Sequence, residues 1–198
     1  MLLFLVDKLV GALATLPVMF LFLICFDKKR FSKKWLWVVL FAIYMNAMMV
    51  MVGIPSYEYI KWNPEINFVP FRDFSSSNIL GMILNMVMFV PFGAFLPIYF
   101  KKFRSLKLTV AAGFFTSLTI EVLQLFCFRA TDVDDLLMNT LGTLIGFFVG
   151  KCIVGLSKKE DEVNKDVINL FVMVLISILV VIFANEQLMS IAIVLFGF

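Results

Sequence analysis

Long apolar runs separated by short polar turns fill most of the chain. The runs at 9–26, 35–53, 78–100, 108–128, 136–156 and 167–184 each have about the length that a helix needs to cross a bilayer. A further apolar tail, 185–198, fits a span as well as a place in the interface. The pattern predicts an all-α polytopic membrane protein, a bundle of about six transmembrane helices that forms one membrane domain over residues 1–198.

The segment 54–77 breaks this pattern. It reads IPSYEYIKWNPEINFVPFRDFSSS, in which prolines, tyrosines and a tryptophan interrupt the apolar character. Aromatic residues of this kind gather at the membrane–water interface. We therefore expect this segment to lie on the membrane surface as an outer-face interfacial segment, instead of crossing the membrane.

Composition supports the membrane assignment and narrows the partners. The chain is 62% hydrophobic with a mean hydropathy of +1.01, well above the roughly 45–50% apolar usage of soluble domains. The net charge of +3 arises from basic residues that cluster in loops between apolar runs. Contact with anionic lipids explains such clusters, so membrane lipids are the predicted partners and nucleic acid is not.

The basic residues also predict the orientation. The loops after the first, third and fifth runs carry thirteen of the seventeen lysines and arginines, which indicates that these loops face the cytoplasm. The thirteen residues are Lys28, Lys29, Arg30, Lys33, Lys34, Lys101, Lys102, Arg104, Lys107, Lys151, Lys158, Lys159 and Lys165. The amino terminus, segment 54–77 and the turn at 129–135 are therefore predicted to face outward.

Metal chemistry and disulfides have little support in the sequence. The chain has no His, which removes the commonest general base and the commonest transition-metal ligand. Its three cysteines, Cys25, Cys127 and Cys152, have no CxxC spacing and are interpreted as small apolar side chains. The Met-rich stretch 45–51 is interpreted as packing. No metal site is predicted.

Polar side chains interrupt the apolar runs near their predicted outer ends. Glu121 lies in the fourth run with Gln124 one turn later, and Asn85 lies about 10 Å deep in the third. Ionisable groups are costly in hydrocarbon and usually face the bundle interior or a water-filled cavity. We therefore expect the polar groups of three helices to meet in an outward-open polar cleft.

The fifth run carries a related pattern. Asp132, Asp135 and Asn139 recur at i, i+3 and i+7, which places them on one face of a helix. Gly142 and Gly146 are predicted to continue that face, and two small residues four apart permit close helix contact. The fifth helix should be polar at its outer end and tightly packed below it.

These residues are the candidate site. Without His, the candidate acid–base groups are carboxylates, namely Glu121, Asp132 and Asp135. Arginine pairs with phosphate or carboxylate through its guanidinium fork, and amides can hydrogen-bond to the same groups. The predicted ligand-binding residues are Arg72, Asn78, Asn85, Gln124, Arg129 and Asn139.

Each assignment has a structural alternative. Glu121 and Gln124 could serve as hydrogen-bonding contacts between helices. Asp132 and Asp135 could cap the fifth helix, because acidic residues favour helix N-termini. Arg129 could anchor the chain at the interface. The sequence leaves these alternatives open.

Three ordered blocks carry a resemblance to a known family. NFVPFRDF at 67–74, NILGMILNMVMFVPFGAFLP at 78–97 and IEVLQLFCFRATDVDDLLMNTLGTLIGF at 120–147 resemble the VanZ-like membrane family over a core of about 60–150. Beyond the site residues above, the matching positions are Pro70, Phe71, Gly81, Pro91, Gly93, Gly142 and Gly146. Met82 departs from the Asn expected there.

The resemblance implies a multi-pass protein of the bacterial cell membrane that lowers susceptibility to teicoplanin and other lipoglycopeptides. The cleft would bind or process an anionic headgroup, such as that of a lipid-linked cell-wall precursor, or the lipoglycopeptide. A lipid flippase or transporter and a non-catalytic membrane interaction protein are the alternatives. No cofactor is predicted, although a catalytic mechanism could use Asp-bound Mg²⁺, for which there is no motif. Whether a reaction occurs, the ligand's identity and the oligomeric state stay open.

Overall fold

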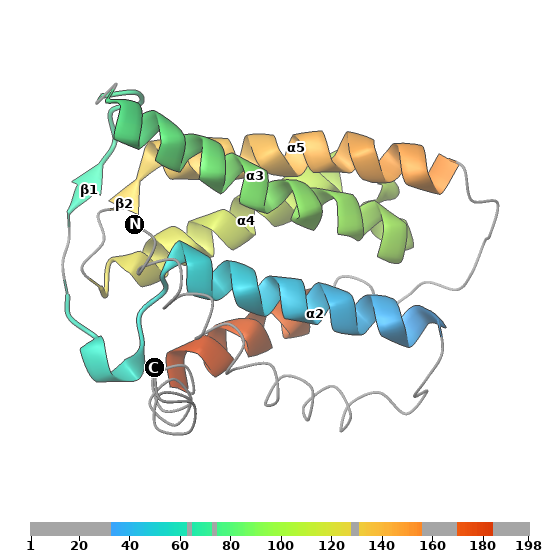
Figure 1. The fold of residues 1–198 in the computed structure, drawn as a ribbon, viewed down its shortest axis with the longest axis horizontal. Coiled ribbons are helices and arrows are strands. Elements are labelled where there is room, and N and C mark those ends of the chain that lie inside the picture. Colours follow the sequence, from blue (N-terminus) through green and yellow to red (C-terminus); the bar gives the residue numbers. More distant parts are fainter. Residues whose placement is uncertain (1–32, 63–64, 73–74, 128–130, 156–169, 184–198) are drawn as a thin grey trace. The chain divides into compact units, whose positions relative to one another are not determined.

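A computed structural model of the protein describes residues 33–62, 65–72, 75–127, 131–155 and 170–183 (Figure 1). The described residues are mostly helical. The chain divides into two compact units, Met1–Lys61 with Phe171–Phe198, and Trp62–Leu170.

The first unit contains α2 (Lys33–Val52), the short 3₁₀ helix η1 (Tyr57–Tyr59) and all but the first residue of an apolar helix, Leu170–Phe183. Val39 and Ala42 of α2 pack against Met173 and Ile176 of that apolar helix. α2 ends where Gly53 adopts a φ of 74°, a conformation that glycine reaches without steric cost.

The second unit contains the elements that position the candidate site. These are β1 (Ile66–Asn67), α3 (Ser76–Tyr99), η2 (Lys101–Arg104), α4 (Leu106–Gln124), β2 (Thr131–Asp132) and α5 (Val133–Gly155). α5 packs extensively along α3 and less extensively along α4, and α3 and α4 contact each other little. β1 and β2 form a two-stranded parallel sheet in which Ile66 pairs with Thr131 and Asn67 with Asp132.

A row of glycines on α5 brings α3 and α5 together. Each lies so close to a backbone carbonyl oxygen of α3 that a Cβ at that position would collide with it. The pairs are Gly142 with Met86, Gly146 with Val90 and Gly150 with Ala94. From one pair to the next, the residue number rises by four on α5 and by four on α3, so the two helices run parallel. The predicted close packing at Gly142 and Gly146 is confirmed, and it extends to Gly150.

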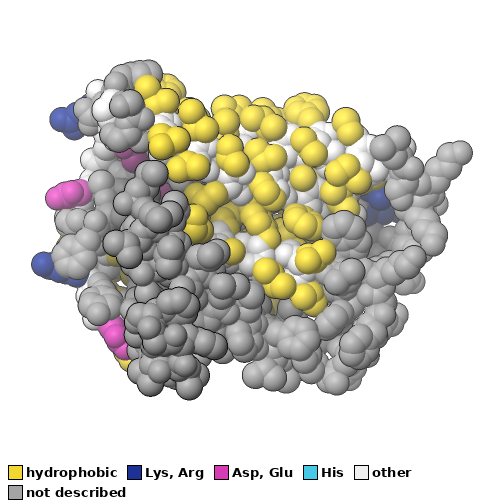
Figure 2. Space-filling view, viewed as in Figure 1, with side chains coloured by type: hydrophobic (Ala, Val, Ile, Leu, Met, Phe, Trp, Pro, Cys, Tyr) yellow, Lys and Arg dark blue, Asp and Glu magenta, His cyan; other side chains and the backbone are white. Residues whose placement is uncertain are grey.

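Three of the described helices are long and apolar enough to cross a membrane. They are Asn78–Tyr99 within α3, Leu106–Gln124 and Val133–Gly155. In Figure 2, hydrophobic side chains cover the length of the helices on the face shown, and charged side chains lie toward their ends. The α3 residues Ile83, Leu84 and Val87 and the α5 residues Phe148 and Ile153 are among the exposed apolar side chains.

The predicted helices that fall on described residues agree in type with the elements there, and their bounds differ. The fourth run, predicted at 108–128, ends as a helix at Gln124 because Phe126 and Cys127 close a tight turn onto the carbonyl oxygens of Leu123 and Gln124. α2 contributes only a shorter apolar stretch, Val39–Val52, as does Leu170–Phe183. The first run, 9–26, and the tail, 185–198, lie outside the described residues, so the count of six transmembrane helices stays a prediction.

Candidate functional site

Asp132 caps α5 and ties it to β1. One carboxylate oxygen, Oδ1, accepts a hydrogen bond from the backbone N–H of Asp134 at 2.9 Å. This is the N-cap geometry that satisfies one of the free N–H groups in a first helical turn. The other oxygen, Oδ2, accepts from Asn67 Nδ2 at 3.2 Å. The capping alternative for Asp132 is thus confirmed, and the same side chain fixes the neighbouring strand.

Glu121 connects the end of α4 to the same turn. Its side chain is buried, and its Oε2 accepts a hydrogen bond from the backbone N–H of Asp132 at 3.1 Å. Its backbone carbonyl accepts from the Thr131 hydroxyl at 3.1 Å. A buried carboxylate in the last turn of a helix is disfavoured by desolvation and by the helix dipole. The hydrogen bond from β2 offsets part of that cost.

Asp134 holds the segment 65–72 against the start of α5. Its Oδ1 and Oδ2 accept the backbone N–H of Phe71 at 3.0 and 2.9 Å. Phe71 has a φ of 55°, a left-handed conformation that is uncommon for a bulky residue and needs support from its surroundings. The next residue, Arg72, is exposed beside this attachment.

Farther along α5, a second polar contact joins α5 to α4. Asn139 is buried and its Nδ2 donates to Ser117 Oγ at 2.9 Å. Within the described part of the chain, Asn139 Oδ1 is buried without a hydrogen-bond partner. Thr143 continues this row: its hydroxyl donates to the carbonyl oxygen of Asn139, and its side chain lies against Gly113 of α4.

The α5 face predicted as continuous is therefore two adjacent rows. Asn139 and Thr143 contact α4, whereas Gly142 and Gly146 contact α3. Residues four apart form one ridge along a helix, and two neighbouring ridges can face different partner helices. Gly93 of α3 also lies against the backbone of Thr143, which places this threonine where the three helices meet.

The structure brings together only part of the predicted set. Glu121 and Asp132 are directly hydrogen-bonded. The other predicted residues are distributed as follows: Gln124, Asn139 and Asn85 are buried, Asp135 is half-buried in the first turn of α5, Arg72 and Asn78 are exposed, and Arg129 lies outside the described residues.

Several contributing residues were absent from the predicted set. Asn67, Thr131 and Asp134 hold the segment 65–72 and the turn before α5 together, and the Ser117 hydroxyl accepts the hydrogen bond from Asn139. The acidic residues in the first turn of α5 gave a signal for Asp134, because such residues favour helix N-termini. Across the described residues, no group of three or more Cys, Asp or Glu side chains is arranged to hold a metal ion.

Three helices are long and apolar enough to cross a membrane, and polar groups form hydrogen bonds at one end of them. These features are those of a helical membrane protein. Residues 41–155 match the sequence model of the VanZ/LLP1 family. Protein VanZ of Enterococcus faecium is 32% identical over 153 residues, which are 76% of this chain and 86% of that protein. No solved structure matches. The chain belongs to the VanZ/LLP1 family, and the family match begins within α2, ahead of the three blocks seen in the sequence.

Proposed function

We propose that the protein lowers susceptibility to teicoplanin-type lipoglycopeptides through a polar site at the end of the membrane domain where α3 and α5 begin. The site faces outward and takes an anionic headgroup, that of a lipid-linked cell-wall precursor or of the lipoglycopeptide. Glu121, Asp132 and Asp135 supply carboxylates, and Arg72, Asn78, Asn85, Gln124, Arg129 and Asn139 supply binding groups.

The observation that carries this proposal is the hydrogen bond between Glu121 and the backbone of Asp132. It couples a buried carboxylate to the turn that also holds the interfacial segment through Asp134. Because α3 and α5 run parallel, their positive dipole ends lie at the same end of the unit. Helix N-termini with a neighbouring arginine favour anionic groups, and Arg72 is exposed there.

A second candidate is a non-catalytic membrane interaction protein. It is favoured by how the carboxylates are used: Asp132 caps a helix and bonds Asn67, and Asp134 holds the backbone of Phe71. In that case the acids maintain the shape of an outer surface, and the exposed side chains of Phe68 and Val69 on the interfacial segment make the contact.

The two candidates differ in what they require of Glu121. Glu121→Gln keeps an oxygen that can accept the Asp132 N–H but removes the negative charge. We expect Arg72→Ala and Arg129→Ala each to reduce protection against teicoplanin toward that of the vector-only host, because each removes a positive charge that holds the headgroup. We expect the same of Glu121→Gln, because it removes the candidate acid–base carboxylate. The measurement is the minimal inhibitory concentration in a susceptible host, with equal membrane levels of each variant.

Glu65→Gln is the matched control. Glu65 is exposed, near the same end, and contributes its backbone carbonyl to Thr131, which the substitution leaves in place. Full protection by Glu65→Gln together with loss in Glu121→Gln supports the headgroup site. Full protection by all three site variants would instead favour the non-catalytic candidate.

A further inference from the structure

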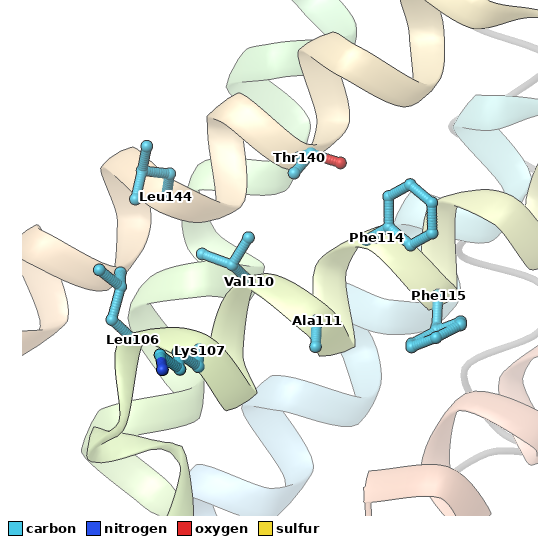
Figure 3. A pocket seen from close by; sticks show the side chains of 8 residues that line it. All are labelled: Leu106, Lys107, Val110, Ala111, Phe114, Phe115, Thr140 and Leu144. Carbon is cyan, nitrogen blue, oxygen red and sulfur yellow. The ribbon is translucent and has the colours of Figure 1, made fainter.

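A groove lies between α4 and α5, and none of the residues that line it belongs to the polar site. It has a cavity volume of about 540 Å³. Side chains of Val110, Ala111 and Phe114 from α4 and of Leu144 from α5 line it (Figure 3). An adjoining cavity of about 260 Å³ shares several of these residues and continues the groove toward Leu141.

The groove has one charged end. Lys107 lines it where α4 begins, and it is exposed. Lys101 and Lys102 of η2 precede it in the chain and are exposed as well. The Thr140 hydroxyl, the other polar group of the lining, donates to the carbonyl oxygen of Leu136 at 2.7 Å and needs no further partner. An occupant therefore has to be apolar along its length and negative at one end.

The dimensions fit one acyl chain. From Leu106 to Phe115, α4 advances about 14 Å, which is close to half of the roughly 30 Å hydrocarbon core of a bilayer. A groove of that length, starting at the basic end, spans a single leaflet. A helix is about 10–12 Å wide, so the same length of helix would fill about twice the cavity volume of 540 Å³.

We propose that the α4–α5 groove is a binding site for an anionic phospholipid, with an acyl chain along Val110, Phe114 and Leu144 and its phosphate at Lys107. The lipid belongs to the leaflet at the basic end, which the positive-inside rule predicts to be cytoplasmic and which carries anionic lipids. Burial of acyl methylenes against the apolar lining and attraction of the phosphate to the ammonium group stabilise the complex.

Native mass spectrometry of the full chain, released from detergent, tests this site. The probes are palmitoyl-oleoyl phosphatidylglycerol and the zwitterionic phosphatidylcholine with the same acyl chains. We expect phosphatidylglycerol to be retained about fivefold more than phosphatidylcholine, the factor expected from one lysine near a headgroup of net negative charge. In phosphatidylcholine the choline cation offsets the charge of the phosphate. Lys107→Gln should remove this preference, and Val110→Trp should lower retention of both lipids because the indole blocks the path of the acyl chain along the groove.

Matched controls separate this site from general lipid contact. Lys151→Gln removes another exposed charge at the basic end, and Val122→Trp adds the same bulk on an exposed position of α4 outside the groove. Both should retain phosphatidylglycerol as the wild type does. Ala111→Leu, a smaller filling change in the lining, replaces Val110→Trp if the latter fails to fold.

Three outcomes would overturn the proposal. The first is retention by both filling variants at the wild-type level. The second is equal retention of the two lipids by the wild type. The third is a dimer mass that disappears on filling the groove while lipid retention does not change, which would make the groove an interface between two copies of the chain.

Discussion

α5 presents two neighbouring faces that pack by different means. Toward α3 it has glycines whose Cα atoms approach carbonyl oxygens of the partner. Toward α4 it has Asn139 and Thr143, and the approach leaves a groove alongside. Hydrocarbon surroundings give no hydrophobic gain when two helices associate, so close van der Waals contact and hydrogen bonds must supply the stability. The glycine face uses the first of these, and the α4 face uses the second.

The difference has a consequence for function. A face without side chains cannot be adjusted without separating the backbones, so α3 and α5 should behave as a rigid pair. The contact between α4 and α5 is held by a few hydrogen bonds, and the groove lies beside it. α4 also carries Glu121, which bonds the backbone of β2. Changes that tune activity or lipid binding are therefore expected on the α4 side.

The largest effect should follow from a methyl group on the glycine face. In Gly146→Ala the new Cβ collides with the carbonyl oxygen of Val90, so α3 and α5 must separate. We expect a loss of about 3 kcal/mol in the free energy of unfolding, the upper end for overpacking. The measurement is thermal stability in detergent by size-exclusion chromatography after heating.

Gly81→Ala is the control for that change. Gly81 lies inside α3, and a Cβ added there would have nothing within 4 Å of it. Alanine is the better helix former there, by about 0.5–1 kcal/mol. Equal stability changes in Gly146→Ala and Gly81→Ala would refute the close approach of α3 and α5.

An intermediate effect is expected where α4 meets the turn. Glu121→Leu removes the acceptor of the Asp132 N–H and leaves that half-buried donor without its carboxylate. We expect a destabilisation of about 2 kcal/mol, within the range for an unsatisfied buried donor. Glu121→Gln, which keeps an acceptor oxygen, should cost much less in the same heating assay. A larger cost for Gln than for Leu would contradict this role for the side chain.

The smallest effect should come from the hydrogen bond between Asn139 and Ser117. A double-mutant cycle with Asn139→Ala and Ser117→Ala should give a coupling of about 0.6 kcal/mol, the average for such bonds between membrane helices. Thr119→Ala with Asn139→Ala is the comparison cycle, because Thr119 is exposed and bonds its own helix. Additive changes in the first cycle would show that this contact adds nothing to the α4 face.

The sequence predicted the features that depend on local periodicity. Apolar runs gave the type of α2 to α5, and the spacing of Gly142 and Gly146 gave the close contact. The same spacing of four continues to Gly150, so the sequence pattern also predicts close contact at that residue. The end of α4 was placed too late because Leu125 and Phe126 are apolar although they lie in a turn.

Features that join distant segments could not be predicted in the same way. The pairing of Asn67 with Asp132 joins residues 65 apart, and the bond between Asn139 and Ser117 joins residues 22 apart. Neither has a periodic signature, because two-residue strands and single interhelical hydrogen bonds depend on where the helices come to lie. Asp132 could be interpreted as a cap or as a site residue from its position alone, and the structure shows the cap.

The end of the membrane domain with Glu121 and Asp132 is proposed to face outward. This orientation is tested most directly by labelling intact cells with a membrane-impermeant maleimide, in a background with Cys25, Cys127 and Cys152 replaced by Ser. Phe68→Cys reports on the exposed interfacial segment, and Lys102→Cys on the basic end. We expect labelling of Phe68→Cys in intact cells and of Lys102→Cys only after permeabilisation; the reverse pattern would contradict an outward-facing site.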